Sequence, residues 1–219
     1  MMDALYRDRI EAGGALAALL GAYRGRDVLV VGIPRGGVAV AAEVARLLDA
    51  ELDVVVARKL GAPGQEELAI GAVTADGGRF LNDEVIKLLN VSEPYVEAVT
   101  HVQMAEARRR EDWLRMLRPA APVAGRTIIL VDDGLATGAT MRAAARSLRQ
   151  RLPARLVAAV PVGSREACTA LRAEVDEVVC PRQPEPFGAI GFYYHHFEPV
   201  EDKQVRDLLE AAPVAGVGH

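Results

Sequence analysis

The sequence predicts an α/β domain with a doubly wound, mostly parallel sheet of five strands and helices on both faces. Short apolar runs rich in β-branched residues recur along the chain, as in strands that are buried on both faces. Segments with apolar residues at helical spacing follow most of these runs, which is the alternation that builds a parallel sheet. Two runs end in turns rich in small residues, at the edge where such sheets bind ligands. The expected strands are 28–31, 52–57, 127–131, 155–160 and 176–180.

The N-terminal part is expected to alternate helix and strand. Leu5, Leu16 and Leu20 lie close to helical spacing, although Gly13 and Gly14 weaken the middle of that helix. A second apolar stripe follows the first glycine-rich turn. The expected order is a helix over 4–24, a strand over 28–31, a turn over 32–37, a helix over 38–48 and a strand over 52–57.

A loop and a hairpin are expected next, over 61–81. The residues Asp76-Gly77-Gly78 are a strong turn signal between two apolar stretches, so they predict the tip of a hairpin. Glu66 and Glu67 lie in the preceding loop and are expected to be solvated, with binding of a metal or a base as the alternative.

A helical insertion is predicted over about 82–118. Helices over 83–90 and 93–117 begin after Asn82 and Ser92, which are residue types that cap helices. Charged residues four apart on the longer helix indicate a salt-bridged solvent face rather than a nucleic-acid site. The pairs are Glu106–Arg110, Arg108–Asp112 and Glu111–Arg115. The insertion offers a surface for a cap or for a homodimer.

The C-terminal part repeats the strand and helix alternation and then becomes aromatic. A helix over 141–151 follows the central strand, and Ser164 is expected to cap another helix that ends at Leu171. The aromatic tail contains His195 and His196, which we expect to pack or to cap rather than to bind a metal. A last helix is expected over 202–209.

Composition limits the classes of function. A chain of 219 residues suits one domain, and its net charge of −4 argues against nonspecific nucleic-acid binding. Cys168 and Cys180 are not spaced as metal ligands, so we expect reduced thiols in or near the core of a cytoplasmic protein. The chain lacks an apolar run of the ~18 residues that could span a membrane.

The stretch from Ile128 to Thr140 holds the strongest functional signal. Apolar residues lead to two adjacent carboxylates, Asp132 and Asp133, and a turn of small residues then leads into a helix. Exposed N–H groups and the dipole at a helix start favour an anion, and small residues let a phosphate approach closely. Carboxylates accept hydrogen bonds from a sugar diol. The stretch therefore predicts a phosphate cradle beside acceptors for sugar hydroxyls, with another kind of nucleotide-binding turn as the alternative.

This stretch resembles the signature of type I phosphoribosyltransferases, which bind 5-phosphoribosyl 1-pyrophosphate (PRPP). Two hydrophobic residues, two acidic residues and a small loop rich in Thr and Gly occur in this order in that family. The resemblance implies that Asp132 and Asp133 bind the ribose hydroxyls and could reach a metal through water or substrate. It also implies that the following loop binds PRPP, with the last four residues on the 5′-phosphate. The loop residues are Gly134, Leu135, Ala136, Thr137, Gly138, Ala139 and Thr140. The insertion and the tail look like those of a predicted, uncharacterised branch of the family.

The turn after the first strand is expected at the same edge and carries the cation Arg35 before Gly36 and Gly37. A purely structural turn is the alternative. Beside the signature, it resembles the family's pyrophosphate loop, where backbone amides and a basic residue hold the diphosphate and a cis non-proline peptide is common. Arg58 and Lys59, expected at the end of the second strand, would assist by facing the departing diphosphate, with solvated charges as the alternative.

The resemblance implies an enzyme that replaces the diphosphate of PRPP by a nitrogen nucleophile, with Mg²⁺ held mostly by substrate oxygens and water. The acceptor would be a base gripped by a hood, which we expect from the N-terminal helix and residues 183–200. In the family, enzymes for 6-oxopurines have an Asp at the position of Ala136, so a 6-oxopurine acceptor is not expected. The alternatives are a regulatory protein that binds PRPP or a nucleotide without turnover, and a hydrolase of phosphorylated ribose.

Overall fold

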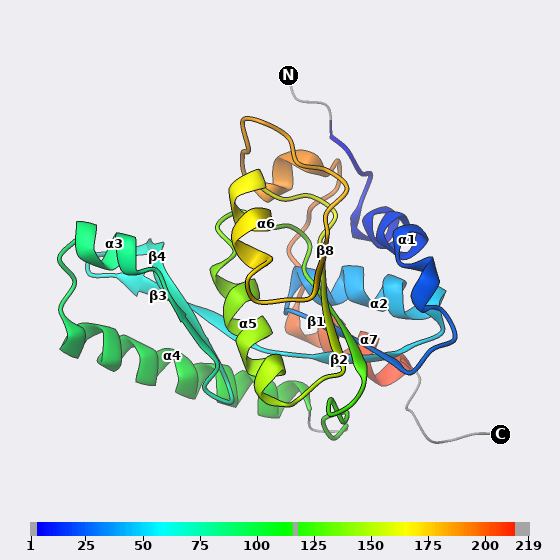
Figure 1. Cartoon of the computed structure of the whole chain (residues 1–219), viewed down its shortest axis with the longest axis horizontal. Coiled ribbons are helices and arrows are strands. Elements are labelled where there is room, and N and C mark those ends of the chain that lie inside the picture. Colours follow the sequence, from blue (N-terminus) through cyan, green and yellow to red (C-terminus); the bar gives the residue numbers. More distant parts are fainter. Residues whose placement is uncertain (1–3, 116–117, 213–219) are drawn as a thin grey trace.

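The structure is a computed structural model that describes residues 4–115 and 118–212. Its core is a parallel sheet of five strands in the order β2-β1-β6-β7-β8 (Figure 1), which confirms the predicted fold class. The strands are β1 (Val28–Gly32), β2 (Glu51–Val54), β6 (Thr127–Val131), β7 (Arg155–Ala159) and β8 (Glu177–Val179).

Helices cover both faces of this sheet (Figure 1). One face packs against α2 (Gly36–Leu48) and α7 (Asp202–Ala211), with α1 (Arg9–Leu19) beside α2. The other face packs against α5 (Ala139–Gln150) and α6 (Arg165–Leu171). A short 3₁₀ turn, η1 (Gly21–Tyr23), follows α1.

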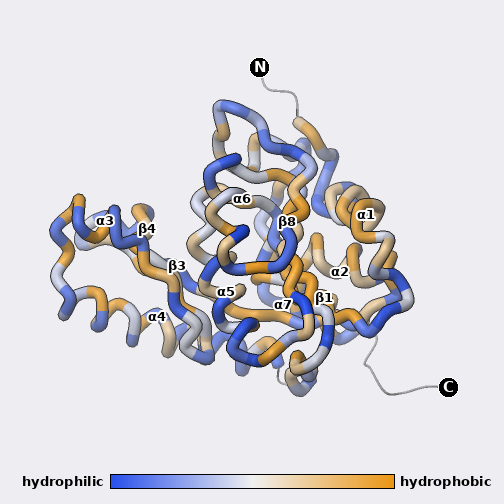
Figure 2. Tube along the Cα trace, viewed as in Figure 1, coloured by the Kyte–Doolittle hydropathy of each residue, from blue (hydrophilic) through white to orange (hydrophobic). Residues whose placement is uncertain are grey.

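The continuous apolar runs are explained by burial on both sides. In β6, Ile129 and Val131 join the core under α2, whereas Ile128 and Leu130 join the core under α5. Successive side chains of a strand point to opposite faces, so a strand with helices on both faces needs apolar residues at every position. In the hydropathy colouring of Figure 2, the central strands are among the hydrophobic parts of the trace.

A second sheet extends from one side of the core, and we call it the arm together with its helices (Figure 1). The arm comprises β3 (Ala57–Ala62), β4 (Gln65–Thr74), β5 (Arg79–Leu81), α3 (Asp83–Leu88) and α4 (Glu93–Leu114). Its strands are antiparallel. The predicted hairpin around Asp76 is confirmed, because β4 and β5 pair across that turn and Thr74 N–H donates to the Gly78 carbonyl at 2.8 Å.

The predicted strand over 52–57 is confirmed only as far as Val54, because the chain then leaves the parallel sheet and begins β3 at Ala57. The apolar run continues through this point without a glycine or proline, so the sequence carries no breaker there. Gly61 and Ala62, expected in a loop, are the last residues of β3.

The arm packs on α5 next to the loop that precedes it. Ala72 of β4 and Phe80 of β5 contact Ala139 and Ala143, and the guanidinium of Arg142 stacks 3.9 Å from the centre of the Phe80 ring. The arm is therefore fixed to the helix whose first turn follows the predicted phosphate loop.

The longer helix of the arm presents a less solvated face than the sequence predicts. The Arg115–Glu111 pair is confirmed at 3.0 Å. Arg110 instead pairs with Asp202 of α7, and the Arg108 Nε donates to the Ala75 carbonyl at 2.7 Å. Arg110 and Arg108 thus attach α4 to other elements, and Arg108 also contacts Met104 of its own helix.

Side-chain caps are confirmed at two of the three predicted positions. The Asn82 side chain accepts from Val85 N–H, and the Ser164 side chain accepts from Ala167 N–H. Ser92 is the N-cap residue of α4, but its side chain makes no capping hydrogen bond. Among the helices of the described residues, none is long and apolar enough to cross a membrane.

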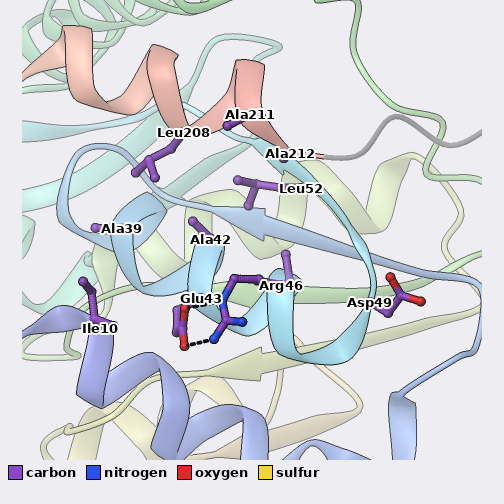
Figure 3. A pocket seen from close by; sticks show the side chains of 11 residues that line it. Ile10, Ala39, Ala42, Glu43, Arg46, Asp49, Leu52, Leu208, Ala211 and Ala212 are labelled. Carbon is purple, nitrogen blue, oxygen red and sulfur yellow. Dashed lines mark hydrogen bonds and ion pairs between the residues drawn. The ribbon is translucent and has the colours of Figure 1, made fainter.

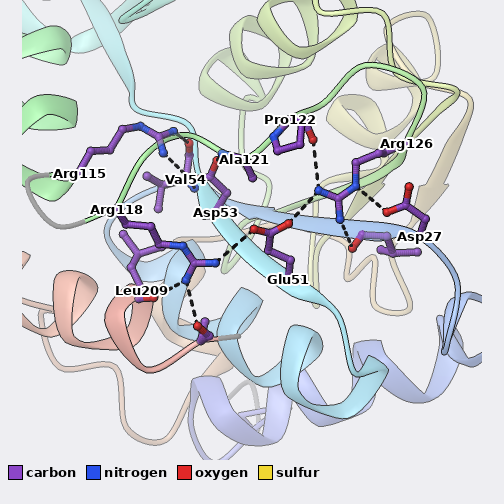
Figure 4. A network of polar contacts seen from close by, with 12 residues as sticks. Asp27, Glu51, Asp53, Val54, Arg115, Arg118, Ala121, Pro122, Arg126 and Leu209 are labelled. Carbon is purple, nitrogen blue, oxygen red and sulfur yellow. Dashed lines mark hydrogen bonds and ion pairs between the residues drawn. The ribbon is translucent and has the colours of Figure 1, made fainter. Parts of the chain in front are cut away.

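Buried ion pairs join β2 to the segments that lie beside it (Figure 4). Asp53 accepts from Arg115 at 2.6 Å and from the Ala121 N–H at 2.9 Å, while Glu51 accepts from Arg126 at 2.8 Å. A buried carboxylate that loses its partner keeps its desolvation cost, so breaking either pair would be unfavourable. The pairs therefore tie α4 and β6 to β2, the strand at the edge of the sheet.

We predict that Arg115→Met lowers the free energy of unfolding by about 3 kcal/mol, because it leaves Asp53 buried without its cation. The matched control is Arg109→Met, which removes an exposed arginine paired with Glu106 on the same helix. Urea denaturation measures both, and the control should leave the midpoint nearly unchanged. Equal, small effects of the two variants would contradict a stabilising role of the Arg115–Asp53 pair.

Candidate active site

The two predicted functional turns meet at the C-terminal edge of the parallel sheet. Strands β1 and β6 are neighbours, with Gly32 level with Val131, and Ile33 N–H donates to the Val131 carbonyl at 3.0 Å. The segments that follow these two strands therefore run side by side. One carries Arg35 and the other carries Asp132.

The glycines after Arg35 pack directly against the two carboxylates. A Cβ added at Gly36 would lie 1.8 Å from Oδ2 of Asp133, and one at Gly37 would lie 2.7 Å from Oδ1 of Asp132. No larger residue fits without displacing a carboxylate. This contact explains why both positions are glycine.

The acidic pair is partly sheltered from water and held by hydrogen bonds. Asp133 Oδ2 accepts from the Arg9 Nε at 2.9 Å, and Asp132 Oδ1 accepts from the Asp133 N–H at 2.9 Å. Burial raises the pKa of Asp132 well above its usual range, the Asp133 charge adds to this, and Arg9 and Lys59 oppose it. Burial also raises the pKa of Asp133, against the effect of Arg9. The site therefore favours cations and hydroxyl donors.

Hydrogen bonds to the segment that follows β7 fix the conformation of the predicted phosphate loop. Leu135 N–H donates to the Val162 carbonyl at 2.9 Å, and the Ser164 Oγ donates to the Ala136 carbonyl at 2.8 Å. Ala136 and Thr137 are exposed at its tip.

The helix that follows this loop begins with an open N-terminus. Gly138, with φ of 77°, is the N-cap of α5, and it offers no side chain to satisfy the first N–H groups. Ala139 is buried and Thr140 is half-buried. Free N–H groups at a helix start, beside exposed small residues, suit an anion.

Arg35 lies on the opposite turn, with its side chain exposed. The peptide bond between Pro34 and Arg35 is cis, as the resemblance to a pyrophosphate loop led us to expect. Arg35 is also the N-cap residue of α2, and its side chain makes no capping hydrogen bond.

Arg58 and Lys59 were expected to end a strand of the main sheet, and this expectation is wrong. The two side chains also do not both face the site. They lie within β3, where successive side chains point to opposite sides. The Arg58 Nε donates to Gln103 of α4 at 2.9 Å. Lys59 is exposed and is close enough to Asp132 to lower the pKa of that carboxyl against the larger effect of burial.

The aromatic tail packs with the N-terminal segment beside the acidic pair. Tyr6 and Tyr194 have ring centres 5.8 Å apart, and Tyr194 stacks on Phe197 at 5.0 Å. The Tyr194 hydroxyl donates to the Asp133 carbonyl at 2.6 Å. A short 3₁₀ turn, η2 (Ile190–Tyr193), places Ile190 against Gly134. This cluster reaches the loop after β6 from the side of α1.

The structure also shows how exposed the other residues are that the sequence singled out. His195 and His196 are exposed rather than packed. Glu66 is exposed, as expected. Cys168 is buried and Cys180 is half-buried, and both are free thiols as expected.

The sequence did not single out Arg9, and it placed Tyr194 in the expected hood without a contact to the acidic pair. Neither belongs to a motif, and each reaches the acidic pair only because the chain folds back on itself. An arginine within an amphipathic helix gives no signal that separates it from a solvated charge.

A metal would find two carboxylates here rather than a closed cage. Within the described ranges, no group of three or more His, Cys, Asp or Glu side chains could hold a metal ion. Two adjacent carboxylates fit a cation that keeps most of its water, such as Mg²⁺.

A separate cavity of about 400 Å³ lies between α1, α2 and α7 (Figure 3). Its lining is mostly apolar, with Leu52 and Leu208 on its walls and the Glu43–Arg46 pair beside them. None of its lining residues belongs to the two functional turns.

Comparison with known proteins agrees with this geometry. The model of the phosphoribosyl transferase domain family matches residues 2–195. A protein of Mycobacterium tuberculosis strain H37Rv, named as a candidate phosphoribosyl transferase, is 43% identical over 208 residues, which are 95% of this chain and 47% of the relative. The chain thus spans about half the length of the curated relatives that it matches.

Two solved structures are similar in fold. The crystal structure of TT1426 from Thermus thermophilus is 44% identical, with a TM-score of 0.80 over 95% of this chain and 99% of that one. A hypoxanthine phosphoribosyltransferase from Staphylococcus aureus is 14% identical, with a TM-score of 0.50 over 85% of this chain and 80% of that one, and it supports the fold alone.

We predict that Gly36→Ala destabilises the protein by roughly 1–3 kcal/mol, because the added methyl group would displace the Asp133 carboxylate. The control is Gly14→Ala, since a Cβ at Gly14 of α1 meets no atom within 4 Å. That change should stabilise the helix slightly. Thermal unfolding compares the two variants. A Gly36→Ala protein as stable as wild type would contradict the packing of this turn on the acidic pair.

Proposed function

We propose that this chain, which belongs to the phosphoribosyl transferase family, binds PRPP and transfers its phosphoribosyl group to a nitrogen nucleophile, with release of pyrophosphate. The observation that carries the proposal is the contact between two turns. The turn of Arg35 rests on the acidic pair, and the loop after that pair ends at an open helix N-terminus. This places a cation, two carboxylates and free N–H groups around one sheet edge, which matches the three chemical parts of PRPP.

The ligand is held in three parts. The amides and hydroxyls of Thr137, Gly138, Ala139 and Thr140 bind the 5′-phosphate at the start of α5. Asp132 and Asp133 accept hydrogen bonds from the ribose hydroxyls. Arg35 and the amides of Gly36 and Gly37 bind the diphosphate across the opposite turn.

The reaction requires little covalent chemistry from the protein. As the bond from C1 to the diphosphate breaks, the sugar gains positive charge and the leaving group gains negative charge. The carboxylates lie on the sugar side and Arg35 on the diphosphate side, so both changes are stabilised by groups that are already in place. Lys59 adds a second cation near the acidic pair. Arg58, engaged by Gln103, supports α4 and assists from farther away.

Mg²⁺ fits this arrangement as a companion of the substrate. The acidic pair would contact it through water or through the ribose oxygens, and most of its ligands would be substrate oxygens and water. When bound, the ion neutralises charge on the diphosphate. Arg35 and Lys59 then orient the group that leaves.

The acceptor would lie between the loop after β6 and the hood formed by α1 and the aromatic tail. Phe192 is 64% exposed on η2, and Ile190 covers Gly134. The loop tip carries Ala136, which has no acid or acceptor to exchange a proton with a base. We therefore propose that the acceptor is a nucleobase other than a 6-oxopurine.

The double variant Asp132→Asn with Asp133→Asn tests the proposal most simply. We predict that it abolishes PRPP binding measured by calorimetry while the protein stays folded, because amides are poorer acceptors for a diol and carry no charge. The matched control is Glu66→Gln with Glu67→Gln, an adjacent acidic pair that is exposed on β4. Unchanged PRPP affinity of the aspartate variant would refute the assignment.

For Arg35→Ala we predict a loss of diphosphate affinity of roughly 10- to 100-fold, as expected for one charge-assisted hydrogen bond. Ribose 5-phosphate lacks the matching group, so its affinity should change little. Calorimetric titration with each ligand separates the two effects. Equal losses for both ligands would place Arg35 outside the diphosphate site.

The purified protein should turn over hypoxanthine, guanine and xanthine poorly. General acid and base help is typically worth about 10²–10⁴-fold, and Ala136 cannot supply it. Steady-state rates with each purine, before and after Ala136→Asp, provide the test. Efficient guanine turnover by the unaltered chain, at the ~10 s⁻¹ usual for enzymes, would refute the prediction.

A further inference from the structure

Arg9 joins three parts of the molecule beside the site. Its Nε donates to Asp133 Oδ2 at 2.9 Å, and its Nη1 donates to the Glu198 carbonyl at 2.9 Å. The same guanidinium lies over the Phe197 ring, 3.9 Å from its centre. Its side chain is 12% exposed, and that of Asp133 is 13% exposed. One cation therefore contacts the acidic pair and the aromatic tail at the same time.

The backbone around Arg9 is fixed, so its reach toward the site is built into the fold. Arg9 is the first residue of α1, and the preceding Asp8 caps that helix by accepting from the N–H groups of Ile10 and Glu11. The segment before the helix is tied to the tail, since the Leu5 N–H donates to the Tyr193 carbonyl at 2.9 Å.

Arg9 donates to one oxygen of the Asp133 carboxylate, and the other oxygen stays able to accept a hydrogen bond. Oδ2 is held between the Arg9 guanidinium and the close-packed Gly36. A carboxylate has two oxygens and about four acceptor sites, so Oδ1 can still accept from a hydroxyl. Holding Oδ2 fixes the rotation of the carboxylate, and it thereby fixes where Oδ1 points.

We propose that Arg9 is a positioning residue for the ribose site and couples that site to the hood. It orients the Asp133 carboxylate for a ribose hydroxyl and compensates its charge. The same guanidinium contacts the Phe197 ring and the Glu198 carbonyl. Movement of the hood therefore changes the orientation of the Asp133 carboxylate, which accepts a hydrogen bond from the sugar. This inference rests on the proposed function, since it concerns how PRPP is held.

A positioning role of Arg9 predicts different changes in affinity for different parts of the ligand, and a merely structural role does not. Arg35 and the glycine amides hold the diphosphate in our proposal. The Arg9 guanidinium lies beside Gly36, but its hydrogen bonds go to Asp133 and to the Glu198 carbonyl rather than to that turn. Loss of the Arg9 side chain should therefore weaken ligands that contain ribose and spare diphosphate alone. General loosening of the site would weaken both.

The experiment compares Arg9→Ala with Arg7→Ala in the full chain. Arg7 is the matched control, since it is two positions away, 67% exposed and paired only locally with Asp8. Calorimetry with PRPP, ribose 5-phosphate and diphosphate gives three affinities for each protein. We expect Arg9→Ala to weaken PRPP and ribose 5-phosphate at least 10-fold and diphosphate less than 2-fold. Arg9→Lys should recover part of the loss, and Arg7→Ala should match wild type.

A double-mutant cycle gives the sharper readout. In an Asp133→Asn background, removal of the Arg9 side chain should cost less than 2-fold further in ribose 5-phosphate affinity, because the group that it orients has already lost its charge. Phe197→Leu should show a weaker loss with the same split between ligands, and it serves as the test if Arg9→Ala does not fold.

The outcomes distinguish this inference from the function on which it rests. If wild type binds no PRPP, both are overturned. If wild type binds PRPP but the Arg9 and Phe197 variants bind all three ligands as wild type does, only the positioning role is overturned. Equal losses for ribose 5-phosphate and diphosphate would also overturn it.

Discussion

The candidate site depends on the direct contact between a glycine turn and two half-buried carboxylates. Gly36 and Gly37 have no side chains, so their backbone can lie against Asp133 and Asp132. This contact is possible only because β1 and β6 are neighbours in register and their following turns leave the sheet at one level. The order of the strands, the glycines of the turn and the acidic pair therefore depend on one another. A change in any of them would move the cation of one turn relative to the carboxylates of the other.

Charge balance is the second requirement of this contact. Two adjacent carboxylates beside packed backbone repel each other and lose hydration, and burial raises the pKa of both groups. Arg9 compensates from α1 and Lys59 from the arm, so distant parts of the chain stabilise the ionised pair. The ion pairs along the edge strand β2 obey the same rule, since the partner of each buried charge comes from another segment (Figure 4). Elements that look peripheral along the chain thus support the central strands electrostatically.

The sequence predicted the central sheet and its loops because their signals are local. The run that forms β6 ends at the predicted residue, and the turn of small residues after Asp133 leads into α5 as expected. Signals failed where tertiary structure decided. The break after Val54 carries no glycine or proline, and Arg110 reaches Asp202 rather than its helical neighbour. The role of Arg9 could not be predicted from the sequence, since it is set by a contact with a residue 124 positions away along the chain.

The most direct test of the proposed activity is release of pyrophosphate from PRPP by the purified chain, measured with Mg²⁺ and with a panel of nucleobases. We predict release that depends on one acceptor and is slow without it, with a nucleotide as the second product. Tight PRPP binding without release for any acceptor would contradict a transferase and favour a regulatory protein. Rapid release without an acceptor, yielding ribose 5-phosphate, would contradict it in favour of a hydrolase.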